Sequence, residues 1–245
     1  MKKLLFVGSV TSSLLLQATT AQSANLIISE VLDATLPGAL PKFVELTNTS
    51  EVTIDLSDYG LGIYNNGNLT LTGGGSPTFL NGVITPGDSY VISFENGDSA
   101  GSGTFFDVYG FDPDFFGFNN IINGDDTIAL FDSSETLVDI YGVIGVDGTG
   151  EDWEYADGFA FRNPDVLNSN SSFNISEWTF GGVNSLETGD DIEERDLILA
   201  NTTPGTHRFN AESVPEPLTI LGTGIALTFG VTMKRKNHDD DHGDE

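Results

Sequence analysis

The stretch that decides the fold class is Ile84-Thr85-Pro86-Gly87-Asp88-Ser89-Tyr90-Val91-Ile92, in which a Pro-Gly turn is followed directly by β-branched and aromatic residues. Pro-Gly is typical of a reversing turn, and such a run beside a turn predicts a β-strand. Similar runs recur over residues 26–31, 43–46, 127–131 and 137–141, and several alternate in polarity as half-buried strands do. The chain is therefore predicted to be all-β.

Turn dipeptides separate these runs throughout residues 25–212. They are Asn66-Gly67, Asn81-Gly82, Asn96-Gly97, Asn123-Gly124, Asp147-Gly148, Asp157-Gly158, Pro37-Gly38, Pro86-Gly87 and Pro204-Gly205. No window has a capped apolar stripe with the 3.6-residue period of a helix, and only residues 189–200 form a short charged stretch of either helical or strand character. Many short strands with frequent turns predict an antiparallel sandwich or barrel.

A series of segments within this pattern resembles the lamin tail domain family, in the family's order. The segments are Leu26–Val31, Phe43–Asn48, Ile54–Tyr59, Leu61–Tyr64, Ile84–Ile92, Gly124–Phe131 and Leu137–Gly142. The resemblance covers about residues 26–165 and implies an immunoglobulin-like antiparallel β-sandwich with structural rather than catalytic motif residues. Residues 97–123 look like an insertion, and their six phenylalanines predict that it is packed against the domain.

The N-terminus has the three parts of a secretory signal peptide. Lys2 and Lys3 give the positive start, residues 4–16 are largely apolar, and small residues follow at 21 and 23. Cleavage is expected after Ser23, with Ala24 or Ala21 as the alternatives. Residues 1–23 are therefore interpreted as a signal peptide that precedes a lamin-tail-like body at residues 24–212.

The C-terminus resembles the PEP-CTERM sorting signal of bacterial exosortase systems. Val214-Pro215-Glu216-Pro217 precedes an apolar run at residues 218–233, and Lys234, Arg235 and Lys236 follow. Sixteen residues make a helix of roughly 24 Å, a little short of a hydrocarbon core of about 30 Å, and the basic residues predict a cytoplasmic end. The resemblance implies processing near residues 214–217 by an exosortase-type enzyme, within an anchor segment at residues 213–236. The acidic tail at residues 237–245 departs from the family pattern.

The charge balance excludes nucleic acid as an expected partner. The chain has 37 Asp and Glu residues against nine Lys and Arg residues, and the body keeps only Lys42, Arg162, Arg195 and Arg208. Such a surface repels phosphate backbones, whereas calcium, polycations and neutral sugars remain as candidate partners. The chain has no cysteine, which excludes disulfides, thiolate metal sites and cysteine nucleophiles.

No catalytic residue is predicted, and the chain is not expected to be an enzyme. His207 is the one histidine of the body, it is expected at the surface, and no Gly-x-Ser-x-Gly elbow or phosphate-binding glycine loop accompanies it. Carboxylate pairs are abundant in so acidic a chain, so a glycosidase-like pair stays open as an alternative.

No cofactor is predicted, although calcium is considered at low priority. Calcium needs six to eight oxygen ligands around a tight loop, and the most loop-like candidate is Asp147, Glu151 and Asp152; Asp112-Pro113-Asp114, Asp125-Asp126 and Asp190-Asp191 are alternatives. Trp153, Tyr155 and Trp178 are candidates for stacking on sugars, although core positions are the more common place for such residues.

The sequence therefore predicts an exported, non-enzymatic protein of the cell surface or extracellular matrix. An exosortase-type enzyme would sort it, residues 218–233 would hold it transiently or permanently in a membrane, and its role would be structural, adhesive or linked to exopolysaccharide and biofilm. The alternatives are an extracellular hydrolase acting on polysaccharide and a calcium-dependent carbohydrate-binding module.

Overall fold

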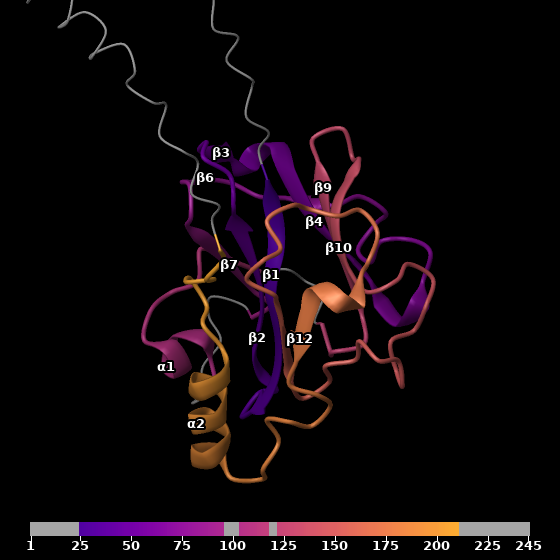
Figure 1. Ribbon diagram of the computed structural model, residues 1–245. Coiled ribbons are helices and arrows are strands. Elements are labelled where there is room, and N and C mark those ends of the chain that lie inside the picture. The colour runs from indigo at the N-terminus through magenta and orange to yellow at the C-terminus, as the bar shows by residue number, and fades with distance from the viewer. Residues whose placement is uncertain (1–24, 96–102, 118–121, 211–245) are drawn as a thin grey trace, which may run out of the picture. The chain divides into compact units, whose positions relative to one another are not determined.

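The computed structural model describes residues 25–95, 103–117 and 122–210 (Figure 1). Its contacts divide the chain into a unit that ends at Asn210 and a second unit, Ala211–Glu245, which lies entirely outside the described residues. The signal peptide, Ser23 and Ala24, the motif at residues 214–217 and the basic residues 234–236 also lie outside them. Among the described residues, no helix is long and apolar enough to cross a membrane.

Two main sheets form the first unit, together with one small strand pair. Within the described residues the larger sheet has the spatial order β12 (Trp178–Phe180), β11 (Phe159–Arg162), β1 (Leu26–Leu36), β2 (Leu40–Asn48), β7 (Ser89–Ser93) and β8 (Phe115–Phe116). The smaller sheet has the order β10 (Leu137–Tyr141), β9 (Thr127–Asp132), β4 (Tyr59–Tyr64) and β5 (Thr78–Phe79), while β3 (Ile54–Asp55) pairs with β6 (Val83–Ile84). The prediction of many short strands is confirmed. One detail is wrong, because β7 and β8 pair in parallel.

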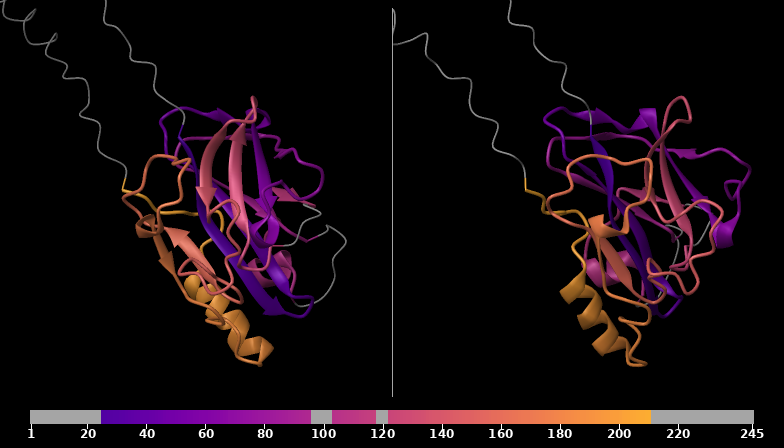
Figure 2. Two further views of the ribbon diagram at one scale, coloured as in Figure 1. Left: turned by 90° about the vertical axis from the view of Figure 1, so that its right-hand side faces the viewer. Right: turned by 45° about the vertical axis from the view of Figure 1, so that its right-hand side comes forward.

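The main core lies between the two sheets. Ile28, Val44 and Ile92 from the larger sheet share one cluster of buried side chains with Ile63 and Ile128 from the smaller sheet. The turn at residues 85–88 positions β7 for this packing, since the Asp88 amide donates to the Thr85 carbonyl at 3.1 Å and Gly87 has φ +83°. Positive φ at the third position of a Pro-Gly turn is the type II geometry that glycine allows. The chain thus forms a β-sandwich with an immunoglobulin-like arrangement (Figure 2).

The larger sheet is covered on its outer face as well, which the sequence did not predict. Leu32, Phe43 and Val91 point away from the main core and form a second cluster with side chains of the helices α1 (Phe105–Tyr109) and α2 (Asp191–Asn201). Strands β1 and β2 are consequently buried on both faces, and their expected alternation between buried and exposed positions is absent.

Helix α2 resolves the ambiguity of residues 189–200 in favour of a helix. The Asp190 carboxylate caps it by accepting hydrogen bonds from the amides of Ile192 and Glu193, and acidic residues fill the first turn, where the helix dipole favours them. The buried carboxylate of Glu194 accepts from the amide and hydroxyl of Thr35 on β1 at 2.8 and 2.5 Å. These bonds hold the helix against the sheet.

The insertion is packed only in part. Phe105 of α1 is fully buried and meets Phe43 edge-on, with ring centroids 5.8 Å apart. Phe106 and Phe111, in contrast, are 53% and 42% exposed, and residues 96–102 and 118–121 lie outside the described chain. The described part of the insertion therefore packs against the domain through Phe105, while Phe106 and Phe111 are largely exposed.

Candidate functional site: a pocket beside the C-terminal covering segment

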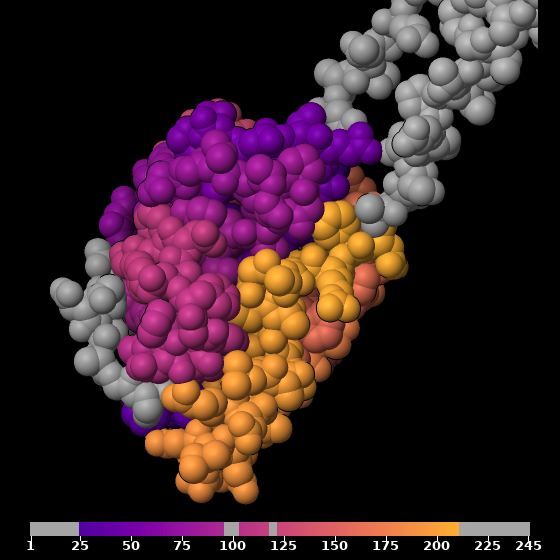
Figure 3. Space-filling model, turned by 90° about the vertical axis from the view of Figure 1, so that its left-hand side faces the viewer, coloured from indigo at the N-terminus to yellow at the C-terminus, as the bar shows by residue number. Residues whose placement is uncertain are grey.

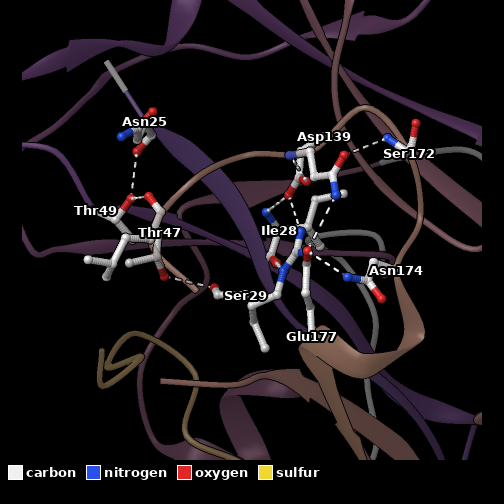
Figure 4. A network of polar contacts seen from close by, with 12 residues as sticks. Asn25, Ile28, Ser29, Thr47, Thr49, Asp139, Ser172, Asn174 and Glu177 are labelled. Carbon is white, nitrogen blue, oxygen red and sulfur yellow. Dashed lines mark hydrogen bonds and ion pairs between the residues drawn. The ribbon is translucent and has the colours of Figure 1, made fainter. Parts of the chain in front are cut away.

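The site begins with two glutamates that face each other on the outer face of the larger sheet. Glu30 of β1 and Glu45 of β2 are register partners, and their side chains are 2% and 0% exposed. The Ser29 hydroxyl donates to Glu45 Oε1 at 2.6 Å, and Thr47 lies 2.8 Å from both the Ser29 and the Ser89 hydroxyl. Figure 4 shows Thr47 and Ser29 joined by one of these bonds. A row of largely buried polar side chains therefore crosses β1, β2 and β7.

The cover is the last part of the described chain, which we call the covering segment (residues 202–210). Its backbone amides satisfy the carboxylates beneath it: Thr203 donates to both oxygens of Glu30 at 3.2 Å, and Gly205 donates to Glu45 Oε2 at 2.6 Å. The Thr206 amide donates to the Thr203 carbonyl at 3.0 Å, and Gly205 has φ +84°, so Pro204-Gly205 forms the expected type II turn. This turn aims the Gly205 amide at Glu45.

Burial changes the protonation of both glutamates. Loss of solvation raises the pKa of Glu45 from 4.5 to about 7, in spite of the hydrogen bonds from Ser29 and Gly205. The pKa of Glu30 is raised well above 4.5, by burial first and by the neighbouring charge of Glu45 second. Both carboxylates are occupied in holding the covering segment, so this pair is closed to a polysaccharide substrate in the arrangement seen here.

Figure 3 looks onto the covered face, where α2 and the covering segment, in orange to yellow, lie beside the magenta region around α1. The two are joined by a contact of 2.7 Å between the Tyr109 and Thr202 hydroxyls. Beside the covering segment lies a pocket of about 350 Å³. It is lined by Phe161, Arg162, Pro164, Ala200, Asn201, Thr203, His207 and Arg208.

A buried ion-pair network holds one side of this pocket. Arg162 is 1% exposed, and its guanidinium donates to Asp139 Oδ2 and to Glu177 Oε2, both at 2.5 Å, and to the Ile28 carbonyl at 3.2 Å. Figure 4 shows Ile28, Asp139 and Glu177 converging from different segments of the chain. The guanidinium also lies 4.5 Å from the ring centroid of Trp178. The side chain of Arg162 is thereby held in one position, and its charge is compensated by the two carboxylates.

The other two cationic side chains of the pocket differ from Arg162. Arg208 is exposed and forms no ion pair with any carboxylate of the described residues. His207 is half-buried, and burial, together with the nearby Arg162 charge, lowers its pKa to about 4, so the imidazole is neutral at pH 7. Its Nε2 is buried and has no hydrogen-bond partner within the described chain. The expectation that His207 lies at the surface is therefore wrong.

The sequence matches a known protein family. The family model described as Lamin Tail Domain matches residues 19–145, just over half of the chain. The chain belongs to the lamin tail domain family. No curated protein matches it. The matched range contains β1 to β10, whereas β11, β12, α2 and every residue that lines the pocket follow it.

The pocket is consequently not a feature that family membership explains. In this lamin tail domain, residues after 145 complete the larger sheet through β11 and β12 and then cover its outer face through α2. A fold hosts many functions, and the specific one is determined by the site built on it. The residues of this added region are therefore the place to look for what the protein binds.

The calcium candidates are not brought together. Asp147, Glu151 and Asp152 are exposed, and Asp147 caps its own turn by accepting from the Thr149 amide at 3.0 Å. Among the described residues, no group of three or more acidic or histidine side chains is arranged to hold a metal ion. Asp125 and Asp126 each leave one buried carboxylate oxygen without a hydrogen bond, and burial raises the pKa of Asp126 to about 6.

The aromatic candidates for sugar stacking are all buried. Trp153, Tyr155 and Trp178 are at most 5% exposed, and all three belong to the main core. The pocket beside the covering segment is instead lined by Phe161, which the sequence did not single out. Phe159 and Phe161 are two residues apart on one strand, and their rings lie parallel with centroids 6.2 Å apart. Because alternate residues of a strand lie on the same face of the sheet, the sequence could have suggested that these two rings are neighbours.

Proposed function

We propose that this lamin tail domain protein is an exported, non-enzymatic protein of the cell surface or extracellular matrix that contacts exopolysaccharide. The observation that carries a binding role is the pocket, which is lined by the half-buried ring of Phe161, by the ion-paired Arg162 and by Arg208, whose guanidinium has no carboxylate partner among the described residues. Largely preformed concave sites with a few directed polar groups are the usual form of small-molecule sites.

Export and sorting are supported by the two ends of the sequence. Residues 1–23 have the order of parts of a signal peptide, and residues 214–217 with the following apolar run and basic cluster have the order of a PEP-CTERM signal. An exosortase-type enzyme would act on this tail, and the apolar run would serve as a membrane anchor before processing. The acidic body agrees with a place outside the cell, where it would stay soluble by charge repulsion.

Intact-mass analysis of the protein from fractionated producing cells tests this function. The expected mass corresponds to loss of residues 1–23 and of everything after Pro217, in the surface or matrix fraction and together with exopolysaccharide. A full tail in the inner-membrane fraction would replace sorting by a simple single-span anchor. An unprocessed chain in the cytoplasm would contradict export altogether.

A calcium-dependent carbohydrate-binding module is the second candidate. It is favoured by one buried carboxylate oxygen each of Asp125 and Asp126, which have no hydrogen-bond partner among the described residues and directly precede β9. Calcium bound to the folded state alone would raise the melting temperature by mass action. The full chain should therefore melt at a higher temperature in millimolar Ca²⁺ than in EDTA if this candidate holds, and identical curves would eliminate it.

A further inference from the structure

The cationic residues of the described chain differ in how they are compensated. Lys42 is paired with Asp33 in a buried contact, and Arg162 is paired with Asp139 and Glu177. Within the part of the chain that the structure describes, Arg208 forms no such pair, although the full sequence carries 37 Asp and Glu residues. A guanidinium that stays unpaired in so acidic a protein, and that lies at the edge of a pocket, is available to an anion from outside.

The pocket provides more than charge. Phe161 presents a half-buried ring, and its parallel contact with Phe159 fixes the orientation of that ring. Apolar C–H faces of sugar rings pack on aromatic faces, as other apolar surfaces do. The covering segment contributes the exposed side chain of Thr203 and part of the His207 imidazole, whose Nε2 is itself buried.

The size of the pocket limits the ligand. About 350 Å³ is at the lower end of the roughly 300 to 1,000 Å³ typical of ligand pockets, which suits one sugar ring better than a long oligosaccharide. A neutral sugar would leave Arg208 unused. A phosphorylated ligand would bring a charge of about −1.5 to −2 into a domain with strong negative potential, and its association would suffer more from repulsion than that of a carboxylate.

We propose that this pocket binds a carboxylate-bearing pyranose, that is, a uronic acid residue of an acidic polysaccharide. Arg208 contacts the carboxylate, Phe161 packs against the apolar face of the ring, and the exposed Thr203 hydroxyl hydrogen-bonds one of the sugar hydroxyls. Arg162 is a positioning residue, because its charge is already paired with Asp139 and Glu177 and its Nε–H donates to the Ile28 carbonyl. The inference rests on the proposed function and names the class of polysaccharide that the protein contacts.

The direct test is a titration of the full chain, in mild detergent micelles, with glucuronate and with glucose as the neutral counterpart. Ligand-detected NMR or calorimetry should show millimolar binding of glucuronate and at least about tenfold weaker binding of glucose, since one charge-assisted hydrogen bond is lost. Arg208→Gln should weaken glucuronate binding by about tenfold and leave glucose binding unchanged. Arg195→Gln, which removes the same charge on α2 outside the pocket, should change neither by more than about twofold.

Several outcomes would overturn the proposal. Equal affinity for the two sugars, an Arg208→Gln variant that binds as the parent does, or no glucuronate binding at all would each remove the uronic acid assignment. The proposed function fails separately: a chain retained on native exopolysaccharide without preference for acidic sugars keeps the surface role and loses this inference. A chain that is never exported loses the surface role, whatever its pocket binds.

Discussion

Replacing Glu45 with glutamine should make the protein more stable at neutral and alkaline pH and leave it nearly unchanged in acid. Glu45 is fully buried, and its pKa is raised from 4.5 to about 7. Between these values the folded state holds a proton that the unfolded state has released, so the free energy of unfolding falls as pH rises through this window. The difference between the two values corresponds to about 3 kcal/mol, which is present below pH 4.5 and lost by about pH 7.

Glutamine imitates the protonated acid in this site. Its Oε1 can accept from the Gly205 amide, while its amide nitrogen donates to the Ser29 hydroxyl, which now donates to Glu45 Oε1. Glu45→Gln should therefore remove this part of the pH dependence. It also removes the charge that raises the pKa of Glu30, so Glu30 should become easier to ionise.

The assay is urea unfolding of the full chain between pH 4.5 and pH 8.5, followed by tryptophan fluorescence, because Trp153 and Trp178 are buried and should report loss of the core. Glu51→Gln is the matched control, since it removes one carboxylate from an exposed position. We expect the variant to exceed the parent by about 3 kcal/mol near pH 8 and to match it near pH 4.5, with the control parallel to the parent throughout. Parallel curves for Glu45→Gln and parent would refute the assignment of this protonation to Glu45.

Three other changes test the network and the turn. Asp139→Ala should cost about 3 to 5 kcal/mol of unfolding free energy, because it removes the more deeply buried of the two carboxylates that pair with Arg162, and a loss below about 1 kcal/mol in urea would contradict this reading. Gly205→Ala should cost about 1 kcal/mol through its φ of +84°, since an added Cβ meets nothing closer than 3.9 Å; hydrogen exchange at residues 203–207 should accelerate, and unchanged exchange would count against the turn. His207→Gln should reduce the loss of stability in mild acid, because the folded imidazole has its pKa lowered to about 4 while the unfolded one takes up a proton below about 6.5. Between pH 7.5 and pH 5 the parent should lose about 2 kcal/mol of unfolding free energy more than the variant in urea, and an equal loss in the two would contradict the burial of this imidazole.

The strands of the sandwich could be predicted because their cause is local. The runs at residues 26–31 and 127–131 contain β-branched residues beside turn dipeptides, and both fall within strands of the structure. The true extent of β1, eleven residues to Leu36, was missed because Asp33 reads as a solvent-exposed position. In the structure Asp33 is 2% exposed and is paired with Lys42, a compensation that a single strand does not reveal.

The second layer over the larger sheet was beyond prediction for a related reason. The residues of α2 that face the sheet include Glu194, whose carboxylate is bound by Thr35, so the buried side of the helix does not read as an apolar stripe. The capping residue Asp190 was visible in the sequence, but a cap alone does not distinguish a helix from a turn. Burial of Glu30 and Glu45 follows from this helix and its extension, so their role could not be seen before the cover was known.

The covering segment contacts both the buried glutamate pair and the pocket. Thr203 lines the pocket, and its backbone amide donates to Glu30. His207 also lines the pocket, and its backbone amide donates to the Ser89 hydroxyl in the polar row around Glu45. A change in the charge of Glu30 and Glu45 therefore acts on the position of pocket residues. Because deprotonation adds two like charges beneath the covering segment, sugar binding should be tighter near pH 5 than near pH 8, and Glu45→Gln should reduce that difference. The measurement is a titration of parent and variant with glucuronate at both pH values. An equal pH dependence in the two proteins would show that the charge of Glu45 does not influence sugar binding in the pocket.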